Sequence, residues 1–296
     1  QAPGEARRMN TKHRGIALWT GASLVVGALV YGGFIYPRSV RADAGTLLSM
    51  CELHLGLAQQ LPLTDGVAKQ QRKDNIDKAL AILDDVEAES PGLSITSEFR
   101  GFAEWMRSDF EAAKRAYGEA LSRAGDDAAL RLRLENNLAA IDLESGKPDR
   151  AIARLEGMEN GRRDASTFIV EAQAWQAKGD AKKRSQALAD GLRRAAKNKD
   201  ANGIYSIAEA AASLGDAIAT SAFEELGAEH ARARYRLAQL KINEGATDTA
   251  TSMLEAIAKT APEALKRWVS EDRGFWIGDR KALADRVLSV TAGPTR

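Results

Sequence analysis

The sequence predicts an all-α protein in which one transmembrane helix is followed by an α-solenoid, a stack of paired helices. Ala, Leu, Glu, Arg and Lys dominate the composition and aromatic residues make up only 6%, which favours helices over a large sheet. An uncharged apolar stretch covers residues 15–36. From residue 67 to residue 262, small residues and polar turns recur every 30 to 38 residues, as expected for stacked units.

The charge balance and the cysteine content exclude several kinds of protein. Lys plus Arg number 42 and Asp plus Glu number 41, so the net charge of +1 predicts no nucleic-acid partner. Cys51 is the only cysteine, which excludes an intramolecular disulfide and a thiolate metal cluster. The compartment must therefore be inferred from another signal.

That signal is the stretch 15–36, which has 22 residues without charge. As a helix it is about 33 Å long, close to the roughly 30 Å thickness of a bilayer core. Trp19 lies near one end and Phe34 and Tyr36 lie at the other, as interfacial aromatic residues do. The sequence predicts a single transmembrane helix here; the alternative is a cleavable signal peptide with a site at 42–44.

Flanking charges predict the orientation of this helix. Four basic residues precede it (Arg7, Arg8, Lys12 and Arg14), whereas two follow it closely (Arg38 and Arg41). This bias places the N-terminus inside and the repeats outside, in the periplasm of a bacterium whose inner membrane holds the helix. The bias disappears if Met9 is the first residue. Small residues spaced by four (Ala17 with Gly21, Ser23 with Gly27, Ala28 with Gly32) either let another helix approach or reflect the ordinary composition of such helices.

The chain divides into five segments. Residues 1–14 form a basic tail, 15–36 the transmembrane helix, 37–66 a juxtamembrane linker and helix, 67–262 the repeats, and 263–296 capping helices with a loose tail. The helix expected at 44–61 carries Cys51 and His54 on one face, and a pair of ligands is too few for zinc. We interpret them as a half-buried thiol and a surface imidazole.

The repeats are clearest at 136–152, where Ala139 and Ala151 flank a polar turn, Ser-Gly-Lys-Pro-Asp. Related turns fall at 108, 146, 179, 215 and 245. Another unit has Gly101, Ala113, Tyr117 and Ala120 at matching places. This pattern resembles the tetratricopeptide repeat (TPR), although Arg184 and Thr220 stand where the family has small residues. A generic α-solenoid is the alternative.

The resemblance implies a protein-binding groove lined by the first helix of each repeat. The family's groove positions fall on Phe99, Phe102, Trp105, Met106, Asn136, Asn137, Ile169, Gln173, Tyr205, Tyr235 and Arg236. Phe99, Phe102 and Trp105 are the expected anchors for a partner; the alternative is that they pack against the helix at 44–61. The family's clamp for a peptide carboxylate is not expected, because Glu98 and Phe102 replace two of its polar residues.

No catalytic residues, cofactor or metal are predicted. The three histidines lie far apart in sequence, and Ser145-Gly146-Lys147-Pro148 lacks the first glycine and the final Ser or Thr of a phosphate-binding loop. The sequence thus predicts a membrane-anchored TPR scaffold or adaptor, an accessory subunit of an inner-membrane or envelope complex, with other proteins as partners. The alternatives are an enzyme-regulating or sensor protein in cell-wall or polysaccharide biogenesis, and a structural subunit held mainly by its anchor helix.

Overall fold

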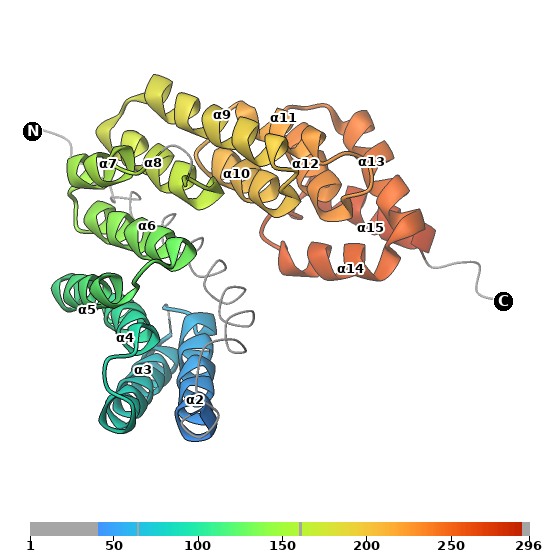
Figure 1. Cartoon of the computed structure of the whole chain (residues 1–296). Helices are drawn as coiled ribbons and strands as arrows, with labels where there is room; N and C mark the ends of the chain where they lie inside the picture. The colour runs from blue at the N-terminus through green and yellow to red at the C-terminus, as the bar shows by residue number, and fades with distance from the viewer. Residues whose placement is uncertain (1–40, 64, 160–161, 292–296) are drawn as a thin grey trace, which may run out of the picture. The chain divides into compact units, whose positions relative to one another are not determined.

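A computed structural model of the chain describes residues 41–63, 65–159 and 162–291 (Figure 1). In these ranges all regular elements are helices and none is a strand, so the all-α prediction is confirmed for the described part. The chain divides into two compact units, residues 1–184 and 185–296. We describe each unit by itself.

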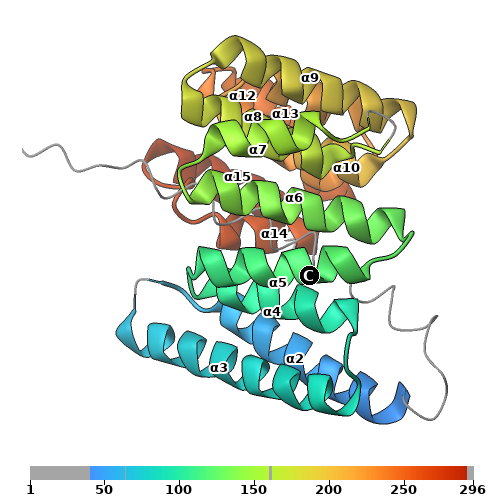
Figure 2. The same ribbon diagram turned by 60° about the vertical axis from the view of Figure 1, so that its left-hand side comes forward.

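Unit 1 consists of helical hairpins. Its elements are α2 (Arg41–Gln60), α3 (Gly66–Glu89), α4 (Ser94–Met106), α5 (Phe110–Arg123), α6 (Ala128–Glu144), α7 (Pro148–Glu156), α8 (Ala165–Lys178) and the start of α9 (Ala181–Lys197). The pairs α2/α3, α4/α5 and α6/α7 pack closely, and Figure 2 shows these hairpins stacked one on the next. Because α2 pairs with α3, the stack begins before residue 67 and includes the helix that the sequence placed in the juxtamembrane segment.

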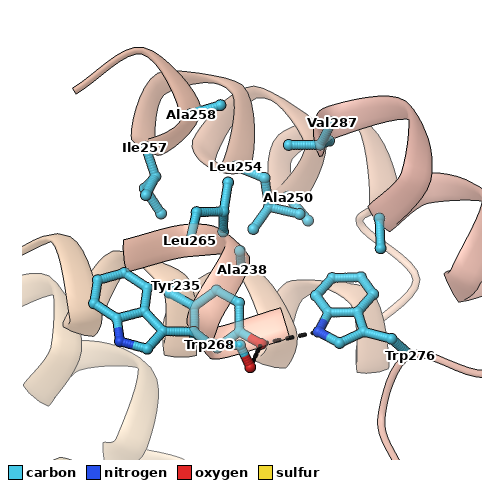
Figure 3. Packing of buried hydrophobic residues seen from close by; sticks show 11 residues of the cluster. Tyr235, Ala238, Ala250, Leu254, Ile257, Ala258, Leu265, Trp268, Trp276 and Val287 are labelled. Atoms are coloured by element: carbon cyan, nitrogen blue, oxygen red, sulfur yellow. Dashed lines mark hydrogen bonds between the residues drawn. The ribbon is translucent and has the colours of Figure 1, made fainter. Parts of the chain in front are cut away.

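Unit 2 also consists of helices. It contains the rest of α9, then α10 (Ala201–Ser213), α11 (Ile218–Glu225), α12 (Ala231–Asn243), α13 (Thr247–Thr260), α14 (Pro262–Glu271) and α15 (Asp279–Thr291). The last two helices pack on α13, where Leu265, Trp268 and Trp276 are buried beside Tyr235 (Figure 3). Residues after 262 therefore close the core of this unit, as the sequence predicts for capping helices.

The predicted turns are confirmed by their backbone geometry. Positive φ angles occur at Ser108, Gly146, Gly179, Gly215 and Gly245, with values of 65°, 73°, 77°, 65° and 82°. The amide of the next residue donates to a carbonyl five residues back in all five turns, for instance Lys147 to Asp142 at 2.8 Å. This is the Schellman pattern that satisfies the last carbonyls of a helix. The turns at 108, 146, 215 and 245 each end the first helix of a packed hairpin and redirect the chain into the second.

Small residues allow the helices of a hairpin to cross closely. Gly101 of α4 faces the ring of Tyr117 of α5, which is fully buried. Ala139 of α6 and Ala151 of α7 are also fully buried. Arg184, which replaces a small residue of the repeat pattern, is the last residue of unit 1.

Short acidic side chains start many of the helices. Each of these side chains accepts a hydrogen bond from a backbone amide in the first turn of its helix, as N-caps do: Asp65, Asp109, Asp127, Asp164 and Asp200. Asp164 also forms a reciprocal capping box with Thr167.

The predicted transmembrane helix at 15–36, with Trp19, Gly21, Gly27, Gly32, Phe34 and Tyr36, lies outside the described residues. Among the helices that the structure describes, none is long and apolar enough to span a bilayer.

Candidate protein-binding groove

The predicted anchor residues of unit 1 lie in its core. Phe99 and Trp105 of α4 are only 7% and 8% exposed. Phe99 packs in a cluster with Cys51 and Leu55 of α2, and Phe102 and Met106 cover the same cluster as half-buried residues. The Phe99 side chain, predicted as an anchor for a partner, is thus already covered by α2 in this structure.

Other residues predicted for this wall are buried within the unit. Trp105 donates its indole N–H to Glu144 at 2.7 Å, and Asn136 donates to Asp164 at 3.2 Å. Asn137 and Gln173 are also buried, at 7% and 8% exposure. Of the residues predicted on α6 and α8, Ile169 alone is half-exposed. The wall formed by the first helices of the hairpins is thus largely closed by its own side chains.

A buried ion pair joins α4 to α6 on this wall. The Glu98 carboxylate is 1% exposed and accepts two hydrogen bonds from the Arg133 guanidinium, at 2.5 and 2.8 Å. Paired, hydrogen-bonded geometry of this kind is what makes a buried carboxylate tolerable. Burial raises the pKa of the neighbouring Tyr117 phenol, with the Glu98 charge as a second cause. The pair holds two repeats together and leaves no open carboxylate for a ligand.

In unit 2 the predicted residues are also engaged. Tyr235 is fully buried and lies between Trp268 and Trp276, so its side chain does not line an open groove in this structure (Figure 3). Arg236 binds Glu209 in a bidentate pair, at 2.7 and 2.9 Å. Tyr205 donates its hydroxyl to the same carboxylate at 2.7 Å and remains half-exposed. These contacts tie α10 to α12.

An open groove lies on the opposite face of α6. Its volume is about 990 Å³. The floor is a stripe of α6 at helical spacing, and the walls come from α5, from α7, from residues 157–159 and from Arg162. The lining residues are Lys114, Gly118, Leu121, Ala128, Arg131, Leu132, Glu135, Leu138, Asp142, Arg150, Ala153, Arg154, Gly157, Met158, Glu159 and Arg162. We call this feature the α5–α7 groove.

The groove is open because the α7 wall is short and the α5 wall carries a residue without a side chain. The helix α7 has 9 residues whereas α5 has 14, so α7 is about 7 Å shorter and leaves the first half of α6 uncovered. Gly118 sits in the middle of α5, where a side chain would meet no atom within 4 Å. A glycine inside a helix costs about 1 kcal/mol relative to alanine. Gly118 carries this cost at the place where the α5 wall of the groove is open.

Ion pairs fix the floor of the α5–α7 groove. Asp142, 4% exposed, lies 2.9 Å from the Lys114 ammonium and 3.5 Å from Nε of Arg154. Arg154 also contacts Glu135 at 2.6 Å. The network joins α5, α6 and α7, so the spacing of the two walls is held by charges that satisfy one another.

The groove has an excess of positive charge over an apolar base. Five of its lining residues are basic and three are acidic. Arg131 reaches only backbone carbonyls, of Leu121 and Gly125, and Arg150 forms no ion pair within the described ranges. Leu121, Leu132 and Met158 are half-buried between these charges. The surface is complementary to a segment with acidic and apolar side chains.

Cys51 and His54, which share a face of α2, are both engaged within unit 1. Cys51 is fully buried, and burial raises the pKa of its thiol to about 12. His54 shares a hydrogen bond of 2.8 Å with Asn75. Three or more His, Cys, Asp or Glu side chains nowhere gather as metal ligands in the part of the chain that the structure describes.

The fold defines the described chain as a helical-hairpin repeat protein. No family model matches the sequence, and no curated protein matches it. Among solved structures, the chain is similar to the C-terminal part of a TPR repeat-containing protein from Cytophaga hutchinsonii. The identity is 16% and the TM-score 0.42, with 74% of this chain and 94% of that chain covered. The repeat architecture itself follows from the hairpin packing and the five turns.

Proposed function

We propose that this chain is a protein-interaction scaffold that holds an acidic, partly apolar segment of a partner protein in the α5–α7 groove. The observation that supports the proposal is an open groove in which basic residues outnumber acidic ones by two and in which leucine and methionine side chains form an apolar surface. Charge complementarity of this kind steers and selects partners. Amphipathic helices bind such grooves through apolar residues at helical spacing.

The size of the groove limits its occupant. Its floor runs along α6 from Ala128 to Asp142, a distance of about 21 Å at 1.5 Å per residue. A helical segment of about 14 residues, or an extended one of about six, matches this length. Acidic side chains of the segment would lie near Arg131 and Arg150, and its apolar side chains would cover Leu132 and Met158.

We further propose that residues 15–36 anchor the scaffold in a bilayer. The uncharged length of this stretch and its terminal aromatic residues support a single span. The basic residues before it favour a bacterial inner membrane with the repeats in the periplasm. The partner is then another envelope protein or a subunit of a membrane complex.

A pair of synthetic peptides tests the binding proposal. Both have 14 residues with leucines at positions 1, 4, 8 and 11, and the remaining positions carry Glu and Ala in one peptide and Lys and Ala in the other. We expect the full chain, held in nanodiscs, to bind the acidic peptide and to reject the basic one, with affinity falling as salt rises. Fluorescence anisotropy of labelled peptide measures both affinities.

Charge reversal in the groove provides the matched comparison. The double variant Arg131→Glu and Arg150→Glu should lower the affinity for the acidic peptide by about tenfold or more. Lys69→Glu with Lys73→Glu changes the same net charge on the exposed face of α3 and should leave the affinity within about twofold. Equal binding of both peptides, or equal loss in both double variants, would exclude the groove as the binding site.

A further inference from the structure

Exposed apolar side chains concentrate in the first hairpin of unit 1. Among the described residues, six large hydrophobic side chains are exposed, and five of them lie between residues 50 and 67: Met50, Leu53, Leu57, Leu63 and Val67. Leu53 is 60% exposed and Leu57 is 43% exposed. Exposed apolar residues are ordinary when scattered, but a cluster of them indicates an interaction surface.

The exposed face of α2 carries no charge. Between residues 44 and 60 its exposed positions are Gly45, Thr46, Ser49, Met50, Leu53, Leu57 and Gln60. At 100° per residue, all of these except Gly45 fall within a stripe of about 120°. We call this stripe the α2 face. It lies opposite the buried side chains of Cys51, Leu55 and Ala58, which pack into the unit.

The neighbouring helix shows what a solvated face of this protein looks like. Exposed positions of α3 include eight charged residues: Lys69, Lys73, Asp74, Asp77, Lys78, Asp84, Asp85 and Glu89. Charged residues make up 28% of the whole chain. The terminal units of a solenoid normally present a polar outer face to water. The α2 face lacks this property, which indicates that it is covered in the working protein.

The sequence before α2 indicates what covers the α2 face. Four residues, 37–40, separate the uncharged stretch 15–36 from Arg41, the first residue of α2. The five steps from Tyr36 to Arg41 reach at most about 18 Å, so a span ending at Tyr36 holds the start of α2 near the bilayer surface. The stretch itself is apolar on every side. Packed onto α2 in water, it would leave most of its apolar surface exposed, which disfavours it as the cover.

We infer that the α2 face lies on the surface of the bilayer, with Met50, Leu53 and Leu57 among the lipid headgroups and upper acyl chains. The inference rests on the proposed anchor at 15–36. An uncharged helix face with a few large apolar residues gains free energy by leaving water at this depth. Two points of attachment, the span and the α2 face, orient the first hairpin relative to the membrane.

Site-specific fluorescence in vesicles tests the inference. The full chain is reconstituted with an environment-sensitive label at Leu53→Cys or at Leu57→Cys, and at Lys73→Cys on α3 as the exposed control. The buried Cys51 stays in place, and the unsubstituted chain measures its background labelling. Lipids with a spin label near the headgroup should quench positions 53 and 57 at least about twofold and leave position 73 unchanged, whereas aqueous iodide should quench only position 73.

Each other outcome overturns the inference. Iodide quenching at position 53 equal to that at position 73 would place the α2 face in water. Protection from iodide without quenching by lipid would show that protein, for instance the stretch 15–36 folded back, covers the face. Flotation of the chain with vesicles is measured separately: a chain that floats but fails the quenching test overturns only the α2 face, whereas a chain that does not float overturns the anchor as well.

Discussion

Gly101 of α4 lies so close to Tyr117 of α5 that a Cβ atom at position 101 would come within 2.8 Å of the ring carbons Cγ and Cδ1. The two residues come from the two helices of one hairpin, and the ring is fully buried. No rotation of a flexible side chain relieves this contact, because the core around Tyr117 is packed. The absence of a side chain at Gly101 sets the distance between the helices.

Gly101→Ala should therefore destabilise unit 1 by about 2 kcal/mol, although alanine favours the helix by about 1 kcal/mol. The matched control is Gly118→Ala in α5, where a Cβ meets no atom within 4 Å and a stabilisation of about 0.5 to 1 kcal/mol is expected. Urea unfolding followed by circular dichroism measures both. If the two alanines shifted stability in the same direction, the close crossing of α4 and α5 would be wrong.

The two most buried tyrosines should respond differently to loss of their hydroxyl groups. Tyr235 donates to the carbonyl of Trp268 at 3.2 Å and accepts from the Trp276 indole N–H at 2.9 Å. The Tyr117 hydroxyl is equally buried and has no hydrogen-bond partner among the described residues. Tyr235→Phe should cost about 2 kcal/mol, because it leaves the buried Trp276 indole N–H without an acceptor. Tyr117→Phe should be neutral or stabilising in the same unfolding measurement, and an equal cost for both would contradict the assigned hydrogen bonds.

The turn at Ser108 differs from its four glycine counterparts by a side chain in the left-handed region, with φ of 65°. Left-handed backbone costs an L-residue roughly 1 to 2 kcal/mol, a cost that glycine does not carry. Ser108→Gly should thus raise stability by roughly 0.5 to 1 kcal/mol after the added freedom of the unfolded chain is included. Gly146→Ala should lower it by about 1 kcal/mol. Differential scanning calorimetry should show melting temperatures that move in opposite directions.

The thiol of Cys51 should be inert in the folded protein. Burial raises its pKa from 9.0 to about 12, and the thiolate is the reacting species. At pH 8 we expect modification by a thiol reagent to be at least about 100-fold slower than in guanidinium chloride. Absorbance at 412 nm with Ellman's reagent provides the measurement. Similar rates in both conditions would show that the core between α2 and α4 opens readily.

Local sequence signals were sufficient for the repeat fold. The five turns fall at the predicted positions because glycine, or a small polar residue, followed by a helix-starting residue is a short-range signal. After the last repeat, Leu265, Trp268 and Trp276 are apolar residues of the kind that the end of a stack must cover. The sequence did not show that α2 and α3 form the first hairpin, because Pro62 interrupts the sequence between them. The proline does not prevent the two helices from packing.

The site was harder to predict, because it depends on contacts between distant residues. Glu98 and Arg133 lie 35 positions apart, and their pairing across α4 and α6 helps to close the wall that the TPR resemblance implies is open. The α5–α7 groove depends on where α7 ends. Two sequence features point to it in retrospect: Gly118 inside α5, and the nine residues of α7 between Lys147 and Gly157.

The most direct test of the account fills the α5–α7 groove. Gly118→Trp places an indole over the floor of the groove from a position where a Cβ meets no neighbour. Ala81→Trp introduces the same side chain at an exposed position of α3 and serves as the control. Titration of the acidic peptide by fluorescence anisotropy should show at least a tenfold loss of affinity for Gly118→Trp and unchanged affinity for Ala81→Trp, with the helical content of both variants preserved. Undiminished binding by a folded Gly118→Trp chain would contradict the claim that this groove is where the partner binds.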